Sequence, residues 1–305
     1  MVKQDSASVL RAGDLTLELA PQVGGSIAAF YSQGEGGRVD WLRPASAEAL
    51  LACDPLGMAS FPLVPWCNRI RDGRARAHGR EIRLQPNYDS PHTIHGIGWQ
   101  TPWHVIGSGQ AEATLQMRLE DESLGWPWAF TATQRYTLTP AGFACELSVR
   151  NDSSGTMPCG LGHHPYFPHH PGTVLQCEVA SMWEGDAQLL PTRLVEPAFL
   201  DELRTGMELS RLDLDNNFTG FGHSFKVSWP SSGDALRLTA SAPLDFFVLY
   251  CPQDKEFFCA EPVSNCTDWI NLQHLSATAV GGAAIEPGQT QSVTFGMTPE
   301  RQRSG

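Results

Sequence analysis

The chain has 305 residues, of which 41% are hydrophobic and 18% are charged, so it is long enough to bury a sizeable core. Its formal net charge of -12 disfavours nucleic acid and anionic membrane as partners, because both are bound through basic surfaces. The same acidity mildly disfavours a dedicated phosphate-bearing substrate, whereas a neutral small molecule fits without difficulty.

The start of the chain carries no recognisable targeting segment. The first 25 residues lack the apolar stretch of a secretory signal, and no run of about eighteen apolar residues occurs in the sequence. We therefore expect a cytoplasmic protein that does not enter a membrane. The eight cysteines show no CxxC spacing, so we expect reduced, mostly buried thiols rather than disulfides or a zinc site.

The N-terminal segments predict strands joined by turns. Leucines at 15, 17 and 19 alternate with polar residues, which is the period of a half-buried strand. A turn at Gly13-Asp14 separates this strand from another at 8–10, and a third is expected over 26–31. Residues 46–52 predict a short helix capped by Ser46. The segment 61–66 has prolines three apart, which favours an extended crossing segment over an internal strand or a helix.

Period-2 alternation dominates the rest of the chain, with turns at intervals of roughly ten residues. Further strands are predicted at 115–119, 131–139, 143–149, 225–229, 236–239, 246–251, 257–260 and 292–297. Neither a GxGxxG nor a GxxxxGK[ST] phosphate loop is present, nor a GxSxG nucleophile elbow. These patterns predict an all-β fold, an antiparallel sandwich or barrel with short helical turns, formed as one domain over residues 1–305.

The segment 160–168, GLGHHPYFP, places two histidines between glycines and prolines. This composition predicts a turn or the irregular end of a strand. Histidine can both give and take a proton near neutral pH, so one of the two is our candidate for a catalytic acid. His169 and His170 follow closely, but adjacent histidines point apart, so no metal site is expected.

Three other clusters join polar side chains to turn geometry. Arg69, after Asn68, presents a planar fork of donors for hydroxyls or carboxylates, unless it is a surface residue. His92 and His95 precede glycines that leave room for a ligand near the backbone, although a structural histidine is the alternative. Glu261, held extended by the following proline, ends an apolar strand, where partial desolvation raises the pKa of a carboxyl toward that of a base. A solvent-exposed glutamate is the alternative there.

Five segments resemble, in this order, those of the aldose 1-epimerases, the mutarotases that include galactose mutarotase. They are FPLVPWCNRIRDG, HTIHGIGWQTPW, GLGHHPYFP, LDNNF and FFCAEPVSN. The resemblance spans nearly the whole chain. It implies a large β-sandwich that binds a free aldose such as galactose or glucose in an open groove, without cofactor or metal.

The resemblance also implies roles for particular residues. Glu261 corresponds to the general base and His164, rather than His163, to the general acid, while His95 assists beside the sugar. Arg69 with Asn68, and Asp215, correspond to residues that bind sugar hydroxyls. Mutarotation removes a proton from the C1 hydroxyl while the ring oxygen gains one, which a carboxylate and an imidazolium on opposite sides can do together.

Some positions depart from the family pattern, and alternatives stay open. Trp269, in the segment 267–271, is a departure that could line or narrow the groove and so alter sugar preference. One alternative is a hexose-6-phosphate 1-epimerase of the same superfamily, which needs a basic pocket. Another is a non-catalytic sugar-binding protein. The preferred aldose, the pathway (galactose metabolism among others), the choice between monomer and homodimer, and the role of His163 stay open.

Overall fold

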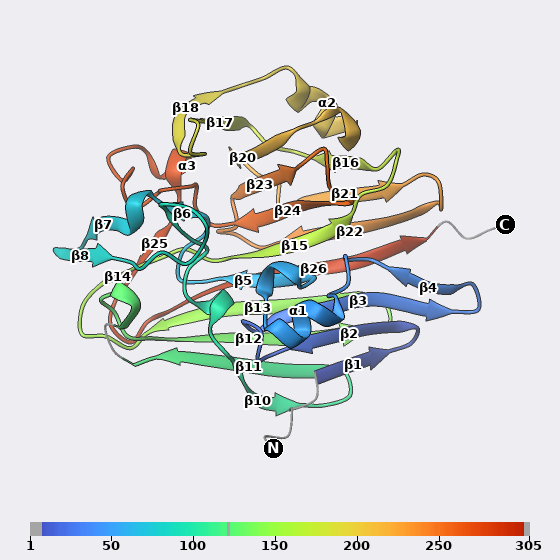
Figure 1. The fold of residues 1–305 in the computed structure, drawn as a ribbon, viewed down its shortest axis with the longest axis horizontal. Coiled ribbons are helices and arrows are strands. Elements are labelled where there is room, and N and C mark those ends of the chain that lie inside the picture. Colours follow the sequence, from blue (N-terminus) through green and yellow to red (C-terminus); the bar gives the residue numbers. More distant parts are fainter. Residues whose placement is uncertain (1–7, 121–122, 302–305) are drawn as a thin grey trace.

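The structure is a computed structural model, and it describes residues 8–120 and 123–301. Within these residues, two large sheets, in which every strand pair is antiparallel, account for most of the strands (Figure 1). The prediction of an all-β fold is confirmed. The predicted helix at 46–52 is also found, as α1 (Ala47–Ala52), and the Ser46 side chain accepts a hydrogen bond from the Ala49 N–H at 3.1 Å.

The larger sheet has eleven strands among the described residues. In spatial order they are β1 (Ser8–Ala12), β2 (Leu15–Ala20), β3 (Ser26–Gly34), β5 (Ser60–Leu63), β15 (Gly162–Pro168), β24 (Phe257–Val263), β23 (Phe246–Cys251), β20 (Leu214–Thr219), β17 (Ser181–Gly185) and β18 (Pro191–Val195), with β4 (Gly37–Asp40) beside β3.

The second sheet has nine strands in the same described part of the chain. In spatial order they are β10 (His104–Ser108), β11 (Glu112–Leu119), β12 (Phe130–Thr139), β13 (Gly142–Asn151), β26 (Thr290–Arg301), β22 (Asp234–Ala240), β21 (Ser224–Trp229), β16 (Val174–Cys177) and β19 (Met207–Glu208).

Smaller elements lie in the connections and at the ends of the sheets. The strand pairs are β6 (Arg69–Ile70) with β9 (Thr93–Ile94), β7 (Arg74–Ala77) with β8 (Arg80–Arg83), and β14 (Met157–Cys159) with β25 (Ala283–Ile285). The other helices are α2 (Phe199–Thr205) and α3 (Ala277–Val280), with 3-10 turns η1 (Pro55–Gly57), η2 (Arg71–Gly73), η3 (Gly98–Gln100), η4 (Ser123–Gly125) and η5 (Leu209–Arg211).

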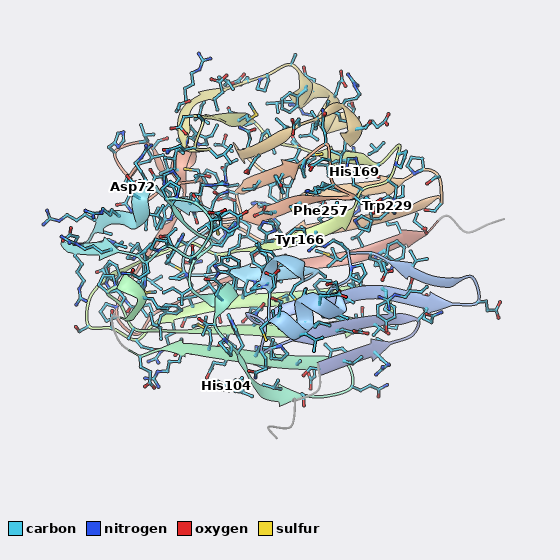
Figure 2. All side chains as sticks on the ribbon, in the orientation of Figure 1. Asp72, His104, Tyr166, His169, Trp229 and Phe257 are labelled. Atoms are coloured by element: carbon cyan, nitrogen blue, oxygen red, sulfur yellow. The ribbon has the colours of Figure 1, made fainter. Side chains whose placement is uncertain are left out.

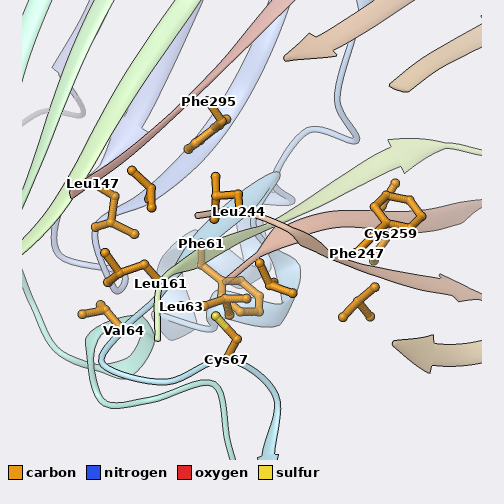
Figure 3. Close-up of a cluster of buried hydrophobic side chains, with 14 of the residues drawn as sticks. Phe61, Leu63, Val64, Cys67, Leu147, Leu161, Leu244, Phe247, Cys259 and Phe295 are labelled. Carbon is orange, nitrogen blue, oxygen red and sulfur yellow. The ribbon is translucent and has the colours of Figure 1, made fainter. Parts of the chain in front are cut away.

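One hydrophobic cluster fills the space between the two large sheets. Phe167 on β15 meets Phe225 on β21 edge to face at 5.7 Å, and Phe30 on β3 meets Phe143 on β13 at 4.9 Å. Figure 3 shows part of this cluster, with Phe295 among the labelled side chains. Inward and outward residues alternate along the strands because successive side chains of a strand point to opposite faces.

Two sequence-based expectations about proline-containing segments are wrong. Residues 60–63 form β5, an internal strand, and residues 162–168 form β15, a central strand rather than a turn. Pro62 is tolerated because β5 pairs with β3 only through Ser60, so the missing N–H of the proline is not needed on that side. The histidine pair therefore lies on a regular strand, and its two side chains point to opposite faces.

The registers of the central strands set two rows of side chains on the outer face of the larger sheet. Gly162 pairs with Val263 and Tyr166 with Cys259, so the same register places His164 opposite Glu261. Directly opposite residues of neighbouring strands share one face. The first row, across β5, β15, β24, β23 and β20, is Phe61, His164, Glu261, Val248 and Asn217. The second, across the last four of these strands, is Tyr166, Cys259, Tyr250 and Asp215.

Candidate active site

A cavity of about 570 Å³ opens on the outer face of the larger sheet, above these two rows. Its floor comes from the central strands, and its walls come from the loops 88–92 and 187–189. The structure brings all six predicted site residues to this cavity. They are Asn68, Arg69, His95, His164, Asp215 and Glu261.

His164 and Glu261 form a close pair on the cavity floor. The imidazole Nε2 lies 3.3 Å from the carboxylate Oε1, and the side chains are only 8% and 2% exposed. The remaining polar atoms, Nδ1 of the histidine and Oε2 of the glutamate, are buried and make no hydrogen bond within the described structure. The two groups extend from neighbouring strands on one side of the cavity. We expected them on opposite sides, and the structure differs from that expectation.

Burial drives both members of the pair toward their neutral forms. It raises the pKa of the Glu261 carboxyl well above its usual range, and the charge of Asp215 adds to this effect while Arg69 opposes it. Burial lowers the pKa of His164 to about 3, with the charges of Arg43 and Arg69 acting in the same direction. The pair is therefore favoured in states in which the two groups share one proton in total. Burial opposes a carboxylate or an imidazolium that stands alone.

Arg69 and Asp215 form an ion pair in the cavity wall. A guanidinium nitrogen of Arg69 donates to Oδ2 of Asp215 at 3.2 Å, and another donates to Oδ1 of Asn68 at 3.2 Å. The Arg69 side chain is only 12% exposed, so it is not a surface arginine. The remaining donors of the fork and the second carboxylate oxygen suit the hydroxyls of a polyol.

His95 is held beside the pair by an unusual backbone. Its φ of +64° and the φ of +59° at Asn68 lie in the left-handed region, which is uncommon for residues other than glycine and often marks functional sites. The His95 ring meets His164 edge to face at 5.0 Å. The sequence suggested that Gly96 leaves room for a ligand, but the structure gives this glycine another role. A Cβ there would lie 2.0 Å from the Val64 carbonyl oxygen, so the glycine permits backbone to pack on backbone.

His163 lies on the opposite face of β15, in the core between the sheets. Gln134 donates its amide N–H to the Gly25 carbonyl, so its Oε1 can only accept, and it does so from Nε2 of His163 at 3.1 Å. Nδ1 of His163 is then left to accept from the Ser60 hydroxyl. This network fixes one neutral tautomer, and burial lowers the pKa of His163 to about 3.

Acid should destabilise the protein through His163. The pKa of His163 is about 6.5 in the unfolded chain and about 3 in the folded protein. Between these values the unfolded state binds a proton that the folded state does not, so the free energy of unfolding falls as pH falls. We expect His163 to account for a loss of about 2 kcal/mol between pH 7 and pH 5. Denaturant unfolding at both pH values checks this. His163→Gln, which keeps polar contacts but cannot titrate, should lose this part of the pH dependence, and an unchanged dependence would contradict it.

Comparison with known proteins agrees with this geometry. The model of the family described as Aldose 1-epimerase matches residues 9–297. The chain belongs to this family. It is 30% identical to the uncharacterized protein YphB of Escherichia coli K12 over 94% of this chain and 97% of that one.

Solved structures agree with the family assignment. A candidate aldose 1-epimerase from Escherichia coli K12 is similar with a TM-score of 0.86 and 27% identity, covering 97% of this chain and 99% of that one. A galactose mutarotase-like protein from Clostridium acetobutylicum has the same fold, with a TM-score of 0.86 and 20% identity, over 96% and 95% of the two chains. The prediction of a galactose mutarotase-like sandwich is thus confirmed.

In this family member, Trp269 does not line the cavity. It is 2% exposed and packs against Gly282, where a Cβ would lie 2.1 Å from the indole ring. His169 and His170 lie outside the cavity as well, and the described residues contain no group of three or more metal-ligating side chains. No helix in the described part of the chain is long and apolar enough to cross a membrane.

Several cavity residues were not predicted from the sequence. Tyr166 stacks on the His164 ring, and Tyr88, Tyr250 and the loop 187–189 form part of the wall. Phe61 also stacks on His164, although it is not one of the lining residues. The signal for Tyr166 was present, because residues two apart on a strand share a face. It was missed because the segment was interpreted as a turn. Nothing local in the sequence places the loops over the pair.

Proposed function

We propose that the protein is an isomerase that interconverts the α and β anomers of a free, neutral aldose such as galactose or glucose. The observation that carries this proposal is the contact of 3.3 Å between His164 Nε2 and Glu261 Oε1 on the cavity floor, next to the Arg69–Asp215 pair. The two oxygens that exchange protons in mutarotation are bonded to the same carbon. Two proton-transfer groups lying side by side can therefore reach both.

Ring opening needs two proton transfers. The Glu261 carboxylate takes the proton of the C1 hydroxyl, and O1 becomes a carbonyl oxygen as the bond from C1 to the ring oxygen breaks. The ring oxygen keeps the electron pair of that bond and takes the proton of the His164 imidazolium. Rotation about the C1–C2 bond presents the other face of the carbonyl, and the same transfers in reverse close the ring. Each positioned transfer is typically worth about 10²- to 10⁴-fold in rate.

The pKa directions favour the ring-opening half of this cycle. Before opening, the pair is a carboxylate and an imidazolium, which stabilise each other at 3.3 Å. After opening, it is a carboxylic acid and a neutral imidazole, the forms that burial favours. Glu261 gains a proton from the sugar while His164 gives one to it, so the pair holds one proton in both states and neither state leaves an isolated buried charge.

The charge of the cavity favours a neutral sugar over a sugar phosphate. Among the described lining residues, Arg69 is the one lysine or arginine, and it is already paired with Asp215. Asp89 and Glu261 add two further carboxyl groups. We expect kcat/KM for glucose to exceed that for glucose 6-phosphate by at least about tenfold, because a phosphate would be buried without a cation. A preference for the phosphate would favour the hexose-6-phosphate epimerase instead.

Polarimetry tests the proposal directly. Fresh α-glucose, α-galactose and arabinose are followed to anomeric equilibrium with and without the protein. A faster relaxation with at least one sugar supports the proposed activity. Sugar binding without any change in relaxation would instead indicate a non-catalytic binding protein.

A further inference from the structure

Arg43 is connected to the His164–Glu261 pair through the ring of Tyr166. Its guanidinium carbon lies 3.9 Å from the centre of the Tyr166 ring and 4.7 Å from that of Phe257. Figure 2 shows these two rings close together over the middle of the molecule, and their centres are 5.1 Å apart. The guanidinium also donates to the carbonyl oxygens of Leu56 and Met58, both at 2.7 Å.

The Tyr166 ring contacts both Arg43 and His164. The two rings are stacked with centres 4.8 Å apart and 25° between their planes. The imidazole also stacks on Phe61 at 4.6 Å, and Phe61 stacks in turn on Trp99 at 5.3 Å. The imidazole is thus held by two neighbouring aromatic rings, and the Arg43 guanidinium lies over one of them.

The position of this cation is costly. The hydrogen bonds recorded for Arg43 go to backbone carbonyl oxygens, and within the described residues no carboxylate forms an ion pair with it. Burial lowers the pKa of Arg43 from its usual value, which reflects the cost of holding a charge away from water. The charge of Asp54 attracts the guanidinium, but a largely buried cation without an ion pair among the described residues is not what stability alone favours.

We propose that Arg43 is a positioning residue that fixes the His164 ring through Tyr166 and, through its charge, makes the His164 imidazolium a stronger acid. This inference rests on the proposed function. The ring oxygen of a hemiacetal is a weak base, so a stronger acid transfers its proton more readily. The spacings of 3.9 and 4.8 Å place the guanidinium within about 9 Å of the imidazole, where a unit charge shifts a pKa by about one unit.

Other charged or titratable groups act on His164 as well, and they stay unchanged in the test. Those that face it from the surrounding elements are Glu261 on β24, His95 before η3, Arg69 on β6 and Tyr166 on its own strand, with Cys259 beside Tyr166 and Asp215 acting on Glu261.

The test compares Arg43→Lys with Arg43→Met. Lysine keeps the positive charge without the planar fork, whereas methionine keeps the length without the charge. We expect the pKa that His164 contributes to the pH profile of kcat/KM to move upward by about one unit in Arg43→Met and to stay within about 0.3 unit of the wild type in Arg43→Lys. Arg43→Gln, with amide donors for the two carbonyls, replaces methionine if that variant unfolds in a thermal scan.

Two results would overturn the proposal: a His164 pKa that moves in neither variant, or one that moves equally in both. NMR titration of the His164 imidazole gives the same comparison without turnover, with its signal assigned by loss in His164→Gln. A wild type that fails to speed mutarotation overturns the proposed function, and the titration still decides whether Arg43 sets the acidity of His164.

Discussion

Replacing Glu261 with Gln should reduce the rate of anomer interconversion by roughly a thousandfold, because the loss removes the group that takes the C1 proton. Glutamine has nearly the same shape and can keep a polar contact with His164 Nε2, which lies 3.3 Å from the carboxylate in the wild type. Sugar affinity should therefore change by only a few fold. Polarimetry measures the rate, and calorimetric titration with galactose or glucose measures the binding.

A matched amide substitution serves as the control. Asp215→Asn also removes one carboxylate from the cavity, but it weakens the contact with Arg69 rather than the proton transfer. It should raise KM more than it lowers kcat. Full activity of the Glu261→Gln variant, or a larger loss of kcat in Asp215→Asn, would show that the general base is assigned to the wrong carboxylate.

The second large effect is expected when two adjacent histidines are each replaced with glutamine in separate variants. His164→Gln removes the acid from the cavity floor, so kcat should fall by about 10²- to 10⁴-fold with little change in stability at pH 7. His163→Gln alters a ring in the core between the sheets, so kcat should stay within a few fold while the acid sensitivity of unfolding changes. Polarimetry and denaturant unfolding are applied to both variants. Similar kinetic losses in the two variants would contradict the division of roles.

The fold was predicted well where alternation alone decides it. The leucines at 15, 17 and 19 lie in β2 and are buried, and the apolar residues of 131–139 lie in β12, where buried residues alternate with more exposed ones. The prediction failed where proline was taken as a strand breaker, at Pro62 and at Pro165. A proline removes one donor, and the sheet tolerates this wherever the neighbouring strand does not need that donor. Local sequence does not carry that information, because it depends on which strand lies alongside.

Five of the six site residues lie in clusters that the sequence itself singled out, and the family resemblance added Asp215 and the individual roles. The contact between His164 and Glu261 was not predicted. His164 and Glu261 are about a hundred positions apart, and only the register of β15 against β24 brings them into contact. That register depends on strands pairing over the whole sheet. The stacking of Phe61 on His164 was missed for the same reason, since Phe61 reaches it from a third strand.

The catalytic pair and the cavity walls come from structurally separate parts of the chain. His164 and Glu261 extend from central strands of the eleven-stranded sheet, whereas the outer walls are the loops 88–92 and 187–189. Loops tolerate insertion and substitution far better than central strands do. We therefore expect remodelling of these two loops to change which sugar is accepted while the proposed proton-transfer pair stays in place. Loop exchange between relatives is the experiment that this arrangement suggests for altering substrate range.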